Sequence, residues 1–115
     1  MREIKQGDVF WILVEDGHGP EPGIPHPHVV VEDNAPNGSV MVCALTTNLK
    51  RATLPGNVLL DEGDANLPRR SVVVVSQVST VGKSQLGDYI GSLSAERLKQ
   101  ITAGMYFVQR FTERQ

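Results

Sequence analysis

The chain has 115 residues, a formal net charge of −2 and a hydrophobic share of 40%. This length suits one domain, residues 1–115, and no apolar run approaches the roughly 20 residues of a membrane-spanning helix. The single cysteine, Cys43, excludes an internal disulfide and, with an N-terminus that lacks a secretory apolar segment, favours a cytoplasmic location. The small negative charge argues against broad electrostatic binding of nucleic acid, so any basic surface has to be local.

Short β-branched stretches separated by turn residues predict a series of strands. The first covers 9–14, and a Gly- and Pro-rich loop over 16–25 leads into the second, 28–32. Further strands are predicted at 39–46, 57–60, 71–81 and 89–93. The strand 39–46 is nearly all apolar, which is typical of burial on both faces. In 71–81, the change at Ser76-Gln77 from pure valine to alternation indicates a bulge or an exposed end.

One helix is predicted at the C-terminal end. Ser94 is a good N-cap, and Leu98, Ile101, Met105 and Val108 recur at helical spacing as an apolar stripe. Gly104 weakens this helix and suggests close packing against the sheet. Many short strands followed by one helix predict an α+β fold built as a small curled barrel.

The segment 25–31, with the sequence PHPHVVV, holds the densest group of proton-transfer side chains. Its prolines stiffen the entry to a strand. Because side chains alternate along a strand, His26 and His28 share one face, about 7 Å apart. Histidine changes charge near neutral pH, so the pair could serve as acid and base, or could supply a positive charge when protonated. The alternative is two ordinary residues at a loop edge.

A His-x-His pair on a strand is also found at zinc sites. A structural zinc site needs four ligands, and the chain offers no cysteine cluster. The third histidine, His18, lies in the predicted loop. We therefore expect neither a metal nor another cofactor.

Several short segments of the chain follow one another in a specific order. They are 7–11 (GDVFW), Gly23 before 26–31 (HPHVVV), 44–48 (ALTTN), 54–58 (LPGNV), 71–81 (SVVVVSQVSTV) and the tail from Ile90-Gly91 to Met105. In order and spacing they resemble the MazF/PemK toxin family, over nearly the whole chain. The resemblance implies an SH3-like antiparallel barrel of the MazF/CcdB type with a C-terminal helix. It also implies a homodimer, a sequence-specific, metal-independent endoribonuclease activity and an antitoxin encoded beside the toxin.

Two positions differ from what the family usually carries. Members commonly have Arg-Pro where this chain has His26-Pro27, and that arginine acts on the scissile phosphate. Some members have an acidic residue at the position of Ser76. The threonine after the central strand is retained as Thr46, so the resemblance implies a role for Thr46 at the phosphate.

RNA can be cut without a metal because its 2′-OH can attack the neighbouring phosphorus. The step needs a base, an acid and donors around the phosphorane. We assign these catalytic roles to His26, His28 and Thr46, although a threonine at a strand end often only bonds the backbone. The residues expected to bind RNA, with ordinary solvated positions as the alternative for each, are His18, Thr47, Asn48, Lys50, Arg51, Arg69, Arg70, Ser76, Gln77 and Ser79.

The sequence therefore predicts a toxin-type ribonuclease that cuts single-stranded RNA and leaves a 2′,3′-cyclic phosphate and a 5′-OH. Its expected partners are the RNA, a cognate antitoxin peptide and a second copy of the chain. One rival is a non-catalytic binding module on the same barrel, either an inactive relative or a topoisomerase poison. A second rival is a regulatory module that only binds an antitoxin-like peptide.

Overall fold

The computed structural model describes residues 3–13, 24–34 and 38–113. Within these ranges it contains six strands and one α-helix: β1 (Asp8–Ile12), β2 (His26–Asn34), β3 (Ser39–Thr46), β4 (Val58–Leu60), β5 (Ser71–Gly82), β6 (Tyr89–Ser92) and α1 (Ala95–Glu113). The described connections contain three short 3₁₀ turns: η2 (Leu49–Thr53), η3 (Asp64–Asn66) and η4 (Lys83–Gln85). No helix in the described ranges is both long and apolar enough to cross a membrane.

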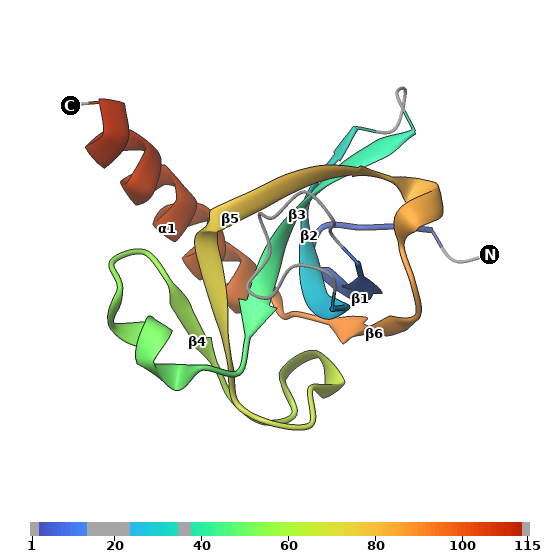
Figure 1. Cartoon of the computed structure of the whole chain (residues 1–115). Helices are drawn as coiled ribbons and strands as arrows, with labels where there is room; N and C mark the ends of the chain where they lie inside the picture. Colours follow the sequence, from blue (N-terminus) through green and yellow to red (C-terminus); the bar gives the residue numbers. More distant parts are fainter. Residues whose placement is uncertain (1–2, 14–23, 35–37, 114–115) are drawn as a thin grey trace.

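The six strands form one antiparallel sheet in the order β4-β5-β3-β2-β1-β6. The sheet curls until η3, at the β4 end, contacts β6 at the other edge (Figure 1). There the side chain of Asn66 donates to the carbonyl of Ile90 at 3.2 Å. Gly91 is required at this closure because a Cβ on it would overlap the backbone of Ala65. The predicted fold class, a curled antiparallel barrel with a C-terminal helix, is confirmed.

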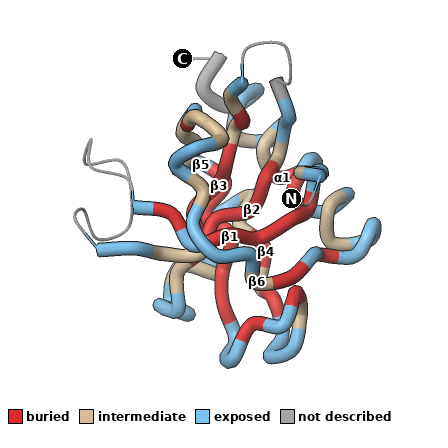
Figure 2. The backbone as a smooth tube through the Cα atoms, turned by 90° about the vertical axis from the view of Figure 1, so that its right-hand side faces the viewer, coloured by how far each residue is buried: buried red, intermediate tan, exposed pale blue. Residues whose placement is uncertain are grey.

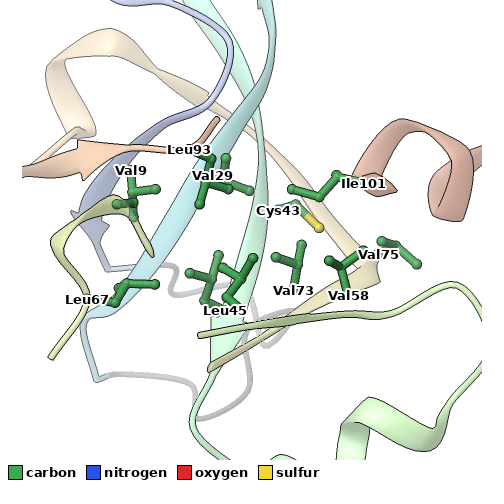
Figure 3. Packing of buried hydrophobic residues seen from close by; sticks show 12 residues of the cluster. Val9, Val29, Cys43, Leu45, Val58, Leu67, Val73, Val75, Leu93 and Ile101 are labelled. Atoms are coloured by element: carbon green, nitrogen blue, oxygen red, sulfur yellow. The ribbon is translucent and has the colours of Figure 1, made fainter. Parts of the chain in front are cut away.

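Side chains alternate between two apolar clusters on the two faces of the sheet. The larger cluster contains Val29, Cys43 and Ile101, and it lies between the sheet and α1 (Figure 3). The smaller cluster lies on the opposite face and consists of Phe10, Ile12, Val30, Val40, Val42 and Val81. Buried residues accordingly follow the strands, and exposed residues follow the connections (Figure 2). Burial of β3 on both faces confirms the interpretation of its apolar sequence.

Strand β5 bends where its sequence changes from valine to polar residues. Cys43 of β3 pairs with Val78 and Leu45 pairs with Val73, so several residues of β5 lie opposite one residue of β3. The thiol of Cys43 donates to the carbonyl of Val74 at 3.0 Å in this bend. Burial raises the pKa of this thiol to about 12, so Cys43 packs as a small neutral side chain. The predicted bulge at Ser76-Gln77 is confirmed.

Helix α1 begins as predicted, because the Ser94 hydroxyl accepts a hydrogen bond from the backbone N–H of Arg97 at 3.2 Å. The Arg97 guanidinium then pairs with Asp61 at 3.0 Å and with Asp64 at 3.1 Å, which ties the helix to the β4–β5 connection. Gly104 permits a close contact, but its neighbour is the loop residue Gly56 rather than the sheet. The reason is that the turn before β4 projects over the middle of α1.

Candidate active site

Three strands bring the predicted catalytic residues to one end of the sheet. The β1–β2 pairing places Phe10 opposite His28 and Ile12 opposite His26. The β2–β3 pairing places His28 opposite Ala44, and the same register continued by two residues puts Thr46 opposite His26. Strand β2 begins at His26, two residues earlier than expected, so both histidines have fixed extended geometry. Their common face carries the smaller apolar cluster.

His26 is half-buried at the mouth of this face. Its Nε2 atom is buried and has no hydrogen-bond partner among the described residues. A buried polar atom left unpaired costs about 1–3 kcal/mol, and such atoms in native proteins often mark functional positions. Among the described residues, nothing therefore uses the hydrogen-bonding capacity of Nε2 of His26.

His28 lies deeper, with 2% of its surface exposed. Its Nδ1 donates to the carbonyl oxygen of His26 at 2.8 Å. Burial lowers the pKa of His28, the hydrogen bond to the carbonyl opposes this, and the nearby His26 lowers it further. His28 is thus a buried neutral imidazole, which differs from the expectation that the two histidines present themselves equally as acid and base. The difference arises because Phe10 and Ala44 flank His28 on both sides.

Thr46 ends β3 with its hydroxyl partly used. The oxygen accepts from the backbone N–H of Asn48 at 3.2 Å, as strand-end threonines commonly do. The hydroxyl hydrogen is not consumed by this bond. Thr46 can therefore still donate to a phosphate oxygen. Thr47 and Asn48, which follow, are exposed, and the Asn48 side chain caps η2 by accepting from Lys50 N at 3.2 Å.

The predicted basic residues lie on two segments near the same end of the sheet. Lys50 is exposed and Arg51 half-buried on η2, while Arg69 and Arg70 are exposed directly before β5. Val72 of β5 pairs with Thr46. Arg69 and Arg70 therefore lead into the strand that lies beside Thr46.

Asn57 has a structural role that its sequence context does not reveal. Its amide nitrogen donates to the carbonyl of Arg51 at 2.9 Å, and its amide oxygen accepts from the backbone N–H of Val75 at 3.1 Å. This side chain fixes η2 against the bend of β5. An asparagine next to a Pro-Gly turn is a sequence signal for the turn alone.

The polar residues of β5 have unequal surroundings. Ser76 is exposed at the bend, whereas Gln77 and Ser79 are half-buried. Ser79 pairs with Val42, so alternation places Gln77 on the face of the smaller cluster, near Ala44. The Oε1 atom of Gln77 is buried without a hydrogen-bond partner in the described part of the chain.

Of the other predictions, His18 lies outside the described residues. Among those that are described, no three or more His, Cys, Asp or Glu side chains gather as a metal site would require. The site thus combines one hydroxyl, nearby basic residues, and an imidazole nitrogen and an amide oxygen that have no partner among the described residues.

The whole chain, rather than the site alone, matches a known family. A family model of PemK-like, MazF-like toxins of type II toxin–antitoxin systems matches residues 5–108. The chain belongs to this family. The predicted resemblance is therefore confirmed, and the chain is a MazF-like toxin of a toxin–antitoxin system.

Individual relatives agree with the family match. The toxin is 29% identical over 106 residues to endoribonuclease MazF2 of Mycobacterium bovis and to endoribonuclease MazF6 of Mycobacterium tuberculosis, covering 89% of this chain and 93% of each relative. A mycobacterial endoribonuclease solved in complex with its cognate antitoxin has a TM-score of 0.70 at 26% identity, covering 90% of this chain and 91% of the other. MazF from Deinococcus radiodurans shares the fold with a TM-score of 0.75 at 20% identity, covering 95% and 98%.

Proposed function

We propose that this toxin is a sequence-specific, metal-independent endoribonuclease that cuts single-stranded RNA. Family membership and the names of the relatives support the reaction class. The observation that carries the chemistry is the Nε2 atom of His26, which is buried and has no hydrogen-bond partner among the described residues, on the strand beside Thr46. Bases of single-stranded RNA present their edges, so a short sequence can be read by side chains around this point.

In the proposed reaction the 2′ oxygen attacks the adjacent phosphorus. The P–O2′ bond forms while the P–O5′ bond breaks, a base takes the 2′-OH proton, and an acid gives a proton to the 5′ oxygen. The products are a 2′,3′-cyclic phosphate and a 5′-OH. His26 supplies one of the proton-transfer groups through Nε2. The Thr46 hydroxyl donates to a non-bridging oxygen, where charge develops in the phosphorane.

His28 acts through His26 in this proposal. It is too deeply buried to approach a phosphate. Its bond to the His26 carbonyl fixes the backbone between the two residues, where Pro27 already restricts rotation. His28 is thus a positioning residue.

The surrounding polar residues hold the RNA. Backbone phosphates take most of the contacts in nucleic-acid binding, so the basic residues of η2 and the segment before β5 follow the phosphate chain. The amide oxygen of Gln77, which has no partner among the described residues, suits a donor group on a base edge. The residues assigned to RNA contact are Thr47, Asn48, Lys50, Arg51, Arg69, Arg70, Ser76, Gln77 and Ser79.

The proposed protein partners are a cognate antitoxin peptide and a second copy of the toxin. One similar structure holds an endoribonuclease with its antitoxin. A two-fold homodimer is supported by exposed apolar side chains on α1, where Tyr106 is 62% and Phe107 52% exposed. Light scattering should give twice the mass of the chain at micromolar concentration. A monomer at that concentration would contradict the dimer.

The ribonuclease is tested with purified toxin and cellular RNA in excess EDTA. Cleavage should persist, sequencing of the new 5′ ends should reveal a short common sequence, and mass spectrometry should find the cyclic phosphate. Activity that disappears with chelator and returns with zinc or magnesium would refute the metal-free mechanism. Because His26 stands where relatives usually have arginine, a non-catalytic module is the second candidate, and RNA that is bound but never cut would establish it.

A further inference from the structure

We infer that Tyr89 of β6 is a stacking platform for one nucleobase of the RNA substrate. The inference rests on the proposed ribonuclease function and adds a contact that the sequence analysis did not identify. Tyr89 pairs with Phe10 across β1 and β6, and Phe10 pairs with His28 across β1 and β2. At ordinary strand spacing, Tyr89 therefore lies about 10 Å from His28 between Cα atoms. This is a distance that a short stretch of single-stranded RNA can bridge.

The ring of Tyr89 is held in one orientation. It packs on Phe10 with ring centroids 5.6 Å apart and an interplanar angle of 62°. Its hydroxyl lies 2.6 Å from the Ser92 hydroxyl, which donates to Asp8 at 2.7 Å. Since Ser92 spends its one hydrogen on Asp8, Tyr89 donates to Ser92. Asp8 is itself buried and accepts from the backbone N–H of Lys5 at 2.9 Å.

What Tyr89 offers to a ligand is the exposed part of its ring. The side chain is 39% exposed although it is anchored at both its edge and its tip. A rigid exposed aromatic binds at low entropic cost because few rotamers are lost. Every base has a π-face, and base–aromatic stacking is a common way to hold single strands.

The charge around Tyr89 differs from the charge around the basic residues that are assigned to the RNA phosphates. The exposed Asp88 directly precedes Tyr89, so a phosphate is disfavoured there, whereas a neutral base is not. The basic residues of η2 and of the segment before β5 are reached across β2 and β3, on the other side of His26. The RNA would thus be held by its backbone on one side of the catalytic histidine and by a stacked base on the other.

The test measures binding of a fluorescein-labelled RNA that contains the mapped cleavage sequence, with the scissile 2′-OH replaced by hydrogen. By fluorescence anisotropy, Tyr89→Leu should weaken binding about 10-fold, within the usual range for one stacked base. Tyr89→Phe, which keeps the ring, should restore most of the affinity. Ser92→Ala should weaken binding about 2- to 3-fold, because the ring stays but its hydroxyl is no longer held.

Abasic substitutions at each RNA position in turn identify the stacked base. One substitution should weaken binding to the wild type about 10-fold yet leave binding to Tyr89→Leu unchanged, which a general loss of folding would not produce. Equal affinity of wild type and Tyr89→Leu for the full RNA overturns the inference. The inference is also overturned if the loss of affinity from Tyr89→Leu and the loss from the abasic substitution add at every RNA position. If the wild type cuts no RNA, no cleavage sequence can be mapped and the ribonuclease proposal fails; the Tyr89 comparison is then made with a labelled random-sequence single-stranded RNA and still decides whether the ring holds a base. If the wild type does not bind, both proposals fail.

Discussion

His28 donates a hydrogen bond from Nδ1 to the backbone carbonyl oxygen of His26, at 2.8 Å. This contact joins two residues of one strand across Pro27, and it assigns the proton of the neutral His28 ring to Nδ1. The two histidines share a face but not a role. One is buried with its Nδ1 atom hydrogen-bonded, and the other keeps a buried ring nitrogen without a partner in the described residues.

The first prediction concerns His26. Replacing it with Ala should lower the single-turnover rate of RNA cleavage by about 10²-fold or more, the usual size of acid–base catalysis. Thr46→Val should lower the rate less, because it removes one donor and leaves proton transfer intact. His26→Arg restores the common family residue; if it retains activity, the position mainly supplies positive charge. A folded, dimeric His26→Ala variant that cleaves at the wild-type rate would contradict the assignment.

The second prediction separates positioning from proton transfer at His28. The amide nitrogen of Asn can take the place of Nδ1, so His28→Asn should keep single-turnover activity within about 10-fold of the wild type. His28→Leu, which lacks a donor, should lose about 10²-fold or more because His26 is no longer held. If both variants lose activity equally while remaining folded, His28 itself moves a proton. The two substitutions are matched because both fill the buried space.

The third prediction follows from the lowered pKa of His28 in the folded protein. The unfolded chain binds a proton at the ordinary value of 6.5, whereas the folded chain binds it only at lower pH. Stability should therefore be complete above pH 6.5 and fall as the pH drops from there toward the folded pKa. Denaturant unfolding of the wild type and of His28→Gln, measured across this range, should show a shallower pH dependence for the variant. His26→Gln is the control and should keep most of the steeper dependence, since burial, the largest cause of the lowered pKa of His28, remains in it.

Local pattern predicted most of the strands. Ser39–Thr46 is the strand that the sequence indicates, and the bend of β5 lies where polar residues interrupt its valines. The helix start at Ser94 could be predicted because capping uses only neighbouring residues. These features depend on interactions between residues close in sequence.

The different surroundings of the two histidines could not be predicted in this way. Alternation correctly puts them on one face, but burial depends on the neighbouring strands, where Phe10 and Ala44 flank His28. The role of Asn57 was missed for the same reason, because its partners include a strand residue far along the chain. Long-range pairing decides such contacts.

The fourth prediction concerns Asn57. Asn57→Ala should destabilise the toxin by about 2 kcal/mol, because it removes two hydrogen bonds and leaves the Val75 N–H at the bend without its acceptor. Asn57→Asp keeps that acceptor but loses the donor to Arg51, so it should destabilise less. Denaturant midpoints at constant slope measure both effects. Equal stability of Asn57→Ala and wild type would show that η2 is held by other contacts.

The last prediction tests the contact between Gly104 of α1 and the turn before β4. In an isolated helix, replacing Gly with Ala stabilises by about 1 kcal/mol. Here a Cβ on Gly104 would overlap the carbonyl oxygen of Gly56, and backbone cannot move aside as a flexible side chain would. Gly56 is itself fixed, since its φ is +86° and a Cβ on it would lie 2.8 Å from the Gly104 carbonyl oxygen.

Overpacking of this kind costs about 1–3 kcal/mol, and the overlap with backbone puts the cost at the upper end. Gly104→Ala should therefore destabilise the toxin by about 2 kcal/mol net. Chemical denaturation measures the change, with the exposed neighbour Ala103→Gly as the control for helix propensity alone, expected to destabilise by about 1 kcal/mol. A Gly104→Ala variant more stable than the wild type would mean that α1 does not pack on this turn.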